Sequence, residues 1–128
     1  MLKYQLAMAL TFACSAASAD NLSGNELLSI CEANGDLAKA GFCLGYVTGV
    51  IEGMKWGAAS PLLMTGTDAS EAERISSVVL GFCSPDSATL GQFVDVVTLH
   101  LRNHPADRHG SARLLTQAAL RDAFPCSQ

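Results

Sequence analysis

The stretch FCLGYVTGVIEG, residues 42–53, decides the fold. Apolar residues that recur at steps of three and four indicate a helix with one buried face. The segment around this stretch keeps that pattern over several turns, and Asp36 is placed to cap it. It therefore predicts a long helix whose buried face holds Phe42, Tyr46, Val50 and Met54 at steps of four, with Val47 and Ile51 beside them.

Three glycines recur every fourth residue in the same predicted helix, at Gly45, Gly49 and Gly53. Each interior glycine costs about 0.5–1 kcal/mol relative to alanine, so the line needs a physical reason. A helix face without Cβ atoms lets another helix backbone approach closely. We predict that the glycines either pack inside the monomer, the favoured reading, or form the seam of a homodimer. A membrane contact is excluded because Glu52 and Lys55 lie on the same segment.

Four more helices are predicted along the chain. Asn21 or Ser23 caps the first, which ends at Gly35. Thr67 or Asp68 caps the third, with Glu71 placed to complete a capping box from Asp68. The fourth covers about residues 89–103 and the fifth begins at residue 111. No segment alternates as a strand would, so the sequence predicts an all-α fold, a compact bundle of about five helices. The expected inward residues are Ile75, Val78, Val79 and Phe82 in the third helix and Leu90, Phe93, Val94, Val97 and Leu101 in the fourth.

Residues 57–67, GAASPLLMTGT, predict the longest break in the chain. Gly57, Pro61 and Gly66 are residue types that interrupt helices. The three adjacent apolar residues in this segment either fold back onto the core or form an apolar contact surface for a partner. They are Leu62, Leu63 and Met64.

The composition is that of one compact domain. The 128 residues are 49% hydrophobic and 16% charged. Eight Lys and Arg residues against twelve Asp and Glu residues give a net charge of −4, and the basic residues form no cluster. Because a phosphate backbone binds to a basic face, nucleic acid is excluded as the natural partner. A mildly acidic surface is compatible with a basic protein partner.

The first nineteen residues have the form of a cleavable export signal. Lys3 supplies a positive charge, residues 6–14 are largely apolar, and residues 17–19 (ASA) form a small-residue cleavage site. The apolar run is too short to cross a bilayer, and no later run is long enough, so we predict no membrane span. Cleavage leaves a single domain, residues 20–128, in the periplasm. A lipid anchor on Cys14 is the alternative, although Thr11-Phe12-Ala13 departs from lipidation signals.

Four cysteines remain after cleavage: Cys31, Cys43, Cys83 and Cys126. An even number in an oxidising compartment predicts two disulfides, with four free thiols as the alternative. A zinc site is disfavoured because no Cys-x-x-Cys spacing occurs. An antiparallel pair of the first two helices would bring Cys31 to Cys43. We therefore predict the pairs Cys31–Cys43 and Cys83–Cys126.

The sequence offers no catalytic constellation. His100 and His104 are four residues apart on a predicted helix, a spacing that can bind a metal, but Leu101 stands where a zinc protease needs glutamate. We expect structural roles for His104 and His109 around Pro105, and a solvated His100. Nucleophile elbows, phosphate loops and haem-attachment motifs do not occur. We predict a protein without catalytic residues, metal or cofactor that acts by binding another protein.

Several motifs, taken in order, resemble the Rap/Tai immunity family of type VI secretion systems. The resemblance implies a small, helical, periplasmic protein, often dimeric, that binds a cognate secreted effector. The effector of such proteins is commonly a cell-wall amidase, whose active site is blocked. The motifs are Gly24 with Leu27-Leu28 and Cys31, FCLGYVTGVIEG (42–53), FCSPDSATLGQ (82–92), LRNHPADRH (101–109), SARLLTQAAL (111–120) and AFPC (123–126).

The cysteines and glycines of these motifs have architectural roles, so we expect the contacts with an effector in loops, which tolerate partner-specific change. The alternative function is that of a periplasmic helical chaperone of the acid-stress kind, or a general binding protein. The expected contact residues are Leu62, Leu63, Met64 and Asp68 in residues 60–68, and Asp107 and Arg108 in residues 103–110.

Overall fold

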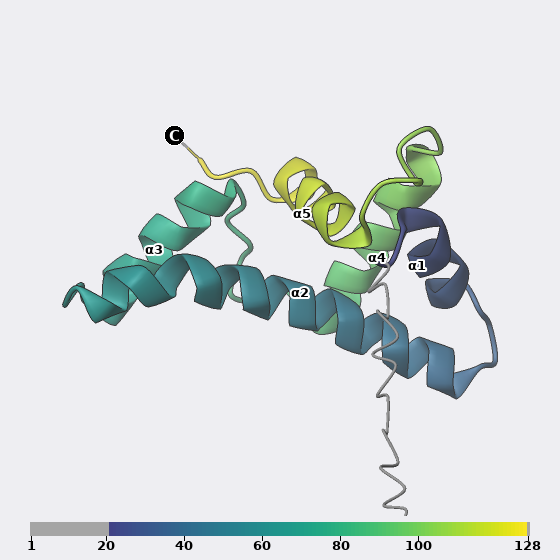
Figure 1. Ribbon diagram of the computed structural model, residues 1–128, viewed down its shortest axis with the longest axis horizontal. Coiled ribbons are helices and arrows are strands. Elements are labelled where there is room, and N and C mark those ends of the chain that lie inside the picture. The colour runs from purple at the N-terminus through teal and green to yellow at the C-terminus, as the bar shows by residue number, and fades with distance from the viewer. Residues whose placement is uncertain (1–20, 128) are drawn as a thin grey trace, which may run out of the picture.

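The computed structural model describes residues 21–127, which form five α-helices and no strand (Figure 1). The all-α prediction is confirmed. The predicted export signal, residues 1–19, lies outside the described residues. Within the described part, no helix has the length and apolar character needed to span a bilayer. The helices are α1 (Gly24–Cys31), α2 (Leu37–Met64), α3 (Ala69–Leu80), α4 (Leu90–Asn103) and α5 (Ala112–Ala123).

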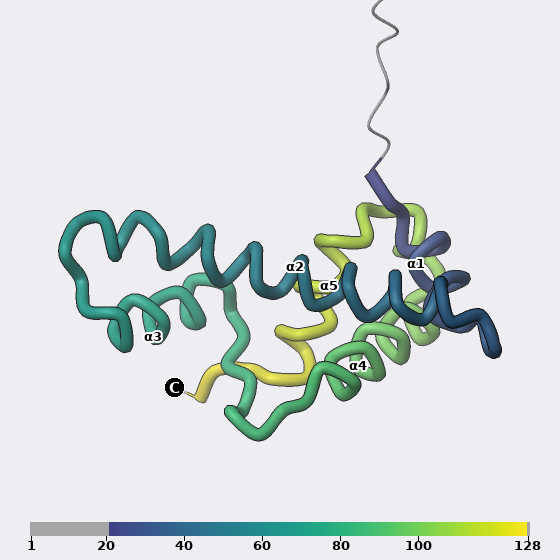
Figure 2. Tube along the Cα trace, turned by 90° about the horizontal axis from the view of Figure 1, so that it is seen from below, coloured from purple at the N-terminus to yellow at the C-terminus, as the bar shows by residue number. Residues whose placement is uncertain are grey.

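The long helix α2 is the spine of the molecule (Figures 1 and 2). Helices α1, α4 and α5 gather along its N-terminal half, whereas α3 turns back along its C-terminal half and packs mainly against α2. We call residues 55–80 the arm. The body consists of α1, α4, α5, residues 37–54 of α2 and the connecting segment 81–89.

Side-chain caps set the helix starts. The Ser23 hydroxyl accepts a hydrogen bond from the backbone N–H of Glu26 at 3.3 Å, and the Glu26 carboxylate accepts one from the backbone N–H of Ser23 at 2.8 Å. This reciprocal pair is a capping box. Asp36 accepts from the backbone N–H of Lys39 at 3.0 Å and starts α2. Gly35, with a φ of 80°, makes the preceding turn in the left-handed region that favours glycine.

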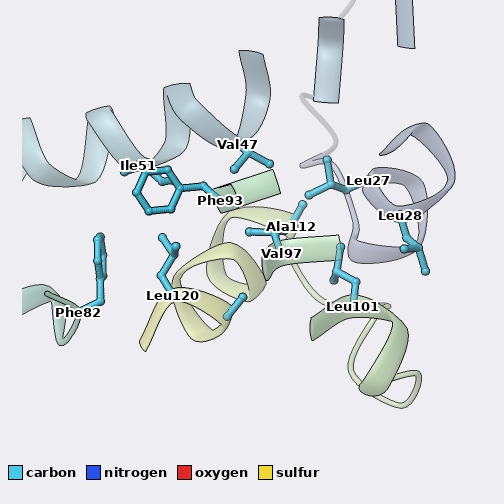
Figure 3. Packing of buried hydrophobic residues seen from close by; sticks show 11 residues of the cluster. Leu27, Leu28, Val47, Ile51, Phe82, Phe93, Val97, Leu101, Ala112 and Leu120 are labelled. Atoms are coloured by element: carbon cyan, nitrogen blue, oxygen red, sulfur yellow. The ribbon is translucent and has the colours of Figure 1, made fainter. Parts of the chain in front are cut away.

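The apolar core lies in the body (Figure 3). Phe82, which follows α3, is fully buried, and in Figure 3 it extends from the end of the arm toward Leu120 of α5. This side chain therefore anchors the base of the arm in the body. The buried members of the core cluster are Leu27, Leu28, Val47, Ile51, Phe82, Phe93, Val97, Leu101, Ala112, Ala119 and Leu120.

Both predicted disulfides are confirmed. Cys31–Cys43 joins the end of α1 to α2, with the Cα atoms 5.1 Å apart. Cys83–Cys126 joins the segment after α3 to the C-terminal segment, with the Cα atoms 4.8 Å apart. The backbone N–H of Cys83 also donates to the carbonyl of Phe124 at 2.8 Å. One bridge thus stiffens the body, and the other fixes the base of the arm.

The predicted break at residues 57–67 is wrong. Helix α2 continues through Gly57 and Pro61 to Met64, and only residues 65–68 form the turn into α3. Pro61 lacks a backbone N–H and is unfavourable inside a helix. The packing of α3 along this half of α2 outweighs that local preference. Leu62, Leu63 and Met64 are therefore helical residues, and the first two are half-buried.

The buried faces of α2 and α3 differ from the predicted ones. In α2 the buried residues are Cys43, Val47 and Ile51, whereas Phe42 is 49% exposed. In α3 the buried residues are Ala72 and Ser76, while Val78 and Val79 are 56% and 72% exposed. Small side chains allow two helices to pack closely, so the contact between α2 and α3 uses the small residues and leaves the valines outside. The fourth helix meets its prediction at Phe93, Val97 and Leu101, but Leu90 at its first position is exposed.

Candidate protein-binding site

The predicted contact residues lie in two separate regions at opposite ends of the molecule (Figure 1). One group is at the end of α2 and in the turn before α3, which is the tip of the arm. The other is in the connection from α4 to α5, beside α1. The structure therefore does not join them into one surface. The arm-tip group is Leu62, Leu63, Met64 and Asp68, and the other is Asp107 and Arg108.

A hydrogen-bonded turn forms the tip of the arm. The Thr65 hydroxyl donates to the carbonyls of Pro61 and Leu62 at 3.2 and 2.9 Å. The same two carbonyls also accept backbone hydrogen bonds, Pro61 from Thr65 and Leu62 from Thr65 and Thr67. Gly66 follows with a φ of 88°, which reverses the chain direction. The local hydrogen bonds favour one shape of the tip.

Asp68 caps α3 from within this turn. Its carboxylate accepts hydrogen bonds from the Ser70 hydroxyl at 2.5 Å and from the Ser70 backbone N–H at 3.1 Å. These bonds stabilise the charged form and hold the pKa of Asp68 below its usual value. The predicted capping box with Glu71 is absent, because the Glu71 carboxylate pairs with Arg74 at 2.6 Å. Asp68 thus has an architectural role.

Several large apolar side chains of the arm are exposed. Met64, the last residue of α2, is 86% exposed at the tip, and Val78 and Val79 are exposed on α3. The helix pair instead buries Ala72 and Ser76. Methionine is flexible and polarisable, and it adapts to irregular protein surfaces. Exposed apolar groups on a projecting element are typical of a protein contact.

Two hollows flank α3. The first, of about 250 Å³, lies between α2 and α3 and is lined by Trp56, Ala59 and Leu63, with Glu73 among its charged residues. The second, of about 600 Å³, lies between the arm and the body. The arm contributes Arg74 and Val78 to this second hollow, and the body contributes Pro85, Phe93 and Cys126. Side chains of a partner could therefore reach α3 from both flanks.

The glycine line of α2 is open. A Cβ atom placed on Gly45, Gly49 or Gly53 would meet nothing within 4 Å. The prediction that these glycines pack inside the monomer is therefore wrong. The helical repeat puts Phe42 and Trp56 on the same face, and they are 49% and 66% exposed. We call the surface formed by Phe42, Gly45, Gly49, Gly53 and Trp56 the open face of α2. Gly49 and Gly53 also border a hollow of about 310 Å³ with Arg113 and Leu114 of α5.

The second predicted contact region, residues 103–110, is tied to α1. The backbone N–H groups of Gly24 and Asn25 donate to the carbonyls of Gly110 and Arg108 at 3.0 and 2.9 Å. The Arg108 side chain is half-buried, and its Nε atom is buried without a hydrogen-bond partner. Asp107 is exposed. This connection therefore supports the position of α1 in the body.

The three histidines stabilise the end of α4 and the connection that follows. The Nδ1 atom of His104 lies 2.8 Å from the carbonyl oxygen of His100, and that of His109 lies 3.0 Å from the carbonyl oxygen of Ala106. The predicted structural roles of His104 and His109 are confirmed. The prediction that His100 is solvated is wrong, because its side chain is only 10% exposed.

The described residues offer several surfaces to a protein partner. All four cysteines among residues 21–127 are in disulfides. In the same range, no group of three His, Cys, Asp or Glu side chains is placed to hold a metal ion. The surfaces available to a partner are the arm, the open face of α2 and the connection before α5.

The sequence analysis did not identify Trp56, Val78 and Val79 as exposed. A signal was present, because Ala72 and Ser76 are small residues four positions apart and mark one face of α3 for a close helix contact. At 100° per residue, Val78 points about 120° away from Ala72, whereas Val79 lies on the same face as Ala72 and its exposure is not explained by the helical repeat. The exposure of Trp56 depends on which side of α2 the other helices cover, and the sequence pattern did not fix that.

A family model described as Rap1a immunity proteins matches residues 23–126. The match contains all five helices and both disulfides. No curated protein and no solved structure shows a significant match to the chain.

Proposed function

The chain belongs to the Rap1a immunity protein family, and we propose that it protects its cell by binding and inhibiting a cognate type VI secretion effector in the periplasm. The family membership supports the immunity role. The two disulfides and the signal-like first nineteen residues support the periplasmic location. We propose that the effector is a peptidoglycan-cleaving amidase, as the resemblance to the Rap/Tai family implies. Inhibition requires no chemistry from this chain, because covering the effector's cleft is sufficient.

The inhibitory element in this proposal is the tip of the arm. The observation that carries it is the 86% exposure of Met64 at the end of a projecting helix pair. Ligand and active sites are concave, so a convex projection can fill one. The Cys83–Cys126 bridge and the buried Phe82 hold the base of the arm. A contact element that is already ordered loses less conformational entropy on binding.

The test of this function is inhibition of a candidate effector, a peptidoglycan hydrolase sought among the genes that neighbour this one. Protein purified from the periplasm is titrated into the effector while peptidoglycan hydrolysis is measured. We expect activity to fall to the background at a stoichiometric ratio. The proposed function is wrong if the effector remains fully active with an excess of the folded protein.

Asp107 and Arg108 form a separate candidate surface, because the body lies between them and the arm tip. In the proposed binding mode this surface contributes little to affinity. The double variant Asp107→Lys and Arg108→Glu should therefore inhibit the effector about as well as the wild type, within roughly threefold, as is usual for charges at the rim of an interface. Loss of inhibition in a variant that keeps its helical circular-dichroism spectrum would place the contact at this end instead.

We also propose that the open face of α2 is the seam of a homodimer. Three glycines with nothing near their Cβ positions weaken the helix of a monomer without any packing benefit there. The pattern is symmetric about Gly49, because Gly45 and Gly53 are four residues from it and Phe42 and Trp56 are seven. An antiparallel crossing of two copies at Gly49 would place Phe42 of each opposite Trp56 of the other. Such an arrangement has the two-fold symmetry of common dimers.

The variant Gly49→Leu tests the dimer seam without destabilising the monomer. Leucine has a higher helix propensity than glycine and meets open space at this position, so the monomer should gain stability. We expect a dimer for the wild type and a monomer for the variant in sedimentation velocity at micromolar concentrations. A monomeric wild type, or a variant that dimerises equally well, contradicts the seam.

A further inference from the structure

A pair of stacked histidines occupies the junction of α4 and α5, away from the arm and the open face of α2. The rings of His100 and His104 have centroids 4.1 Å apart and planes inclined by 24°. The His100 ring is largely buried, whereas His104 is exposed. The Nδ1 atom of His100 lies 3.3 Å from a carboxylate oxygen of Asp122 on α5. The proposed immunity function does not use this pair.

The surroundings of His100 favour its neutral form. Its hollow is lined mainly by apolar side chains, Val96, Leu99, Ala119 and Ala123, with Asn103 at the edge. Three titratable groups face it: His104 from the end of α4, Asp107 from the next connection and Asp122 from α5. The two carboxylates favour a proton on His100, but burial and the neighbouring imidazole oppose it more strongly.

The pair also holds the end of α4. His104 is the C-cap residue of that helix, and its backbone N–H donates to the His100 carbonyl at 3.0 Å. The connection that starts there accepts the two backbone hydrogen bonds that begin α1, at Gly24 and Asn25. A change at the histidine pair can therefore reach α1 through a short, continuous set of contacts.

We propose that the His100–His104 pair is an acid-sensitive latch: a proton taken up by His100 places a charge in an apolar hollow against the stacked His104 ring, which loosens the last turn of α4 and weakens the hold on α1. The device would lower the stability of the body in an acidified periplasm and leave it intact near neutral pH.

The direction of the pH effect follows from the ionisation of His100. Burial first, and then the charge of His104, lower the pKa of His100 in the folded protein below its usual value of 6.5. The unfolded chain therefore takes up this proton at a higher pH than the folded chain. The contribution to stability is fully present above the unfolded pKa and is lost as the pH falls through the folded pKa.

Thermal unfolding between pH 7.5 and pH 5.0 tests the latch. We expect the melting temperature of the wild type to fall in this window by roughly 3–6 °C more than that of His100→Asn, whose amide can still donate to Asp122. The control His109→Asn removes a titrating histidine outside the pair and should keep the wild-type pH dependence. The proposal is overturned if the melting temperature of His100→Asn falls as far as that of the wild type, or if His109→Asn removes the additional fall seen in the wild type.

A second measurement on the wild type does not depend on a variant that folds. The His100 imidazole is titrated by NMR, and amide exchange is followed at Gly24 and Asn25. We expect His100 to titrate at a lower pH than a histidine in an unstructured peptide. The protection of both amides, corrected for the intrinsic pH dependence of exchange, should fall as His100 gains its proton. Titration at or above the peptide value, or unchanged exchange relative to the core of α2, contradicts the latch.

Discussion

The body and the arm consist of the same secondary structure but bury opposite kinds of residue. The body encloses large apolar side chains from four helices, with Phe82, Leu27 and Leu101 almost completely inaccessible. The arm buries Ala72 and Ser76 and exposes Met64, Val78 and Val79. The difference is consistent with our proposal that the body supplies most of the stability and the arm binds the effector. A region with a thin interior and an apolar exterior is suited to a second protein.

The largest expected effect is at the junction of the two regions. Phe82→Ala removes a fully buried ring where the arm enters the core and should lower the free energy of unfolding by about 3–5 kcal/mol. Met64→Ala, a truncation at the exposed tip, should change it by less than about 0.5 kcal/mol. Urea denaturation of both variants measures the contrast. A similar decrease in the free energy of unfolding for both variants would show that the arm tip contributes to stability as the body does.

The two disulfides should also contribute unequally to stability, with the larger contribution from the bridge at the base of the arm. Cys83–Cys126 closes a loop of 43 residues and Cys31–Cys43 one of 12, so chain-entropy arguments give about 4 and about 3 kcal/mol respectively. Replacement of Cys83 and Cys126 by serine should therefore destabilise the protein more than replacement of Cys31 and Cys43. Denaturation midpoints of the two double variants decide the order. The reverse order would mean that the arm's anchor is less important than the bridge inside the body.

A smaller and opposite effect is expected on the open face of α2. Gly45→Ala adds a methyl group that meets nothing within 4 Å and replaces the residue with poor helix propensity. We expect the monomer to gain about 0.5–1 kcal/mol in the free energy of unfolding, measured at a concentration below dimer formation. A loss of stability would indicate that this face is covered within the monomer after all.

The elements with strong local signals could be predicted from the sequence. Ser23 and Asp36 cap the helices for which they were predicted, α4 begins directly after Thr89, close to its expected start, and the even cysteine count led to both bridges. The continuation of α2 through Pro61 could not be predicted. It depends on α3, which packs along that half of the helix and overrides the local preference of proline and glycine.

The candidate site was predicted in part. The sequence left open whether residues 62–64 fold back or stay exposed, and Met64 is exposed at a helix end instead of in a loop. The separation of Asp107 and Arg108 from the arm tip depends on the tertiary arrangement, and so does the burial of His100 between α4 and α5. A single sequence carries no direct signal for such distances.

The most direct test of the division between body and arm compares the two ends of α2. Met64 and Leu37 are its last and first residues, both apolar and exposed to 86% and 89%. The dissociation constant of the cognate effector is measured for Met64→Asp and Leu37→Asp, with melting temperatures confirming that both are folded. We expect Met64→Asp to weaken binding by at least about 30-fold, as for a central contact residue, and Leu37→Asp to change it less than about twofold. Equal affinities for the two variants, or a larger loss for Leu37→Asp, would contradict the assignment of recognition to the arm.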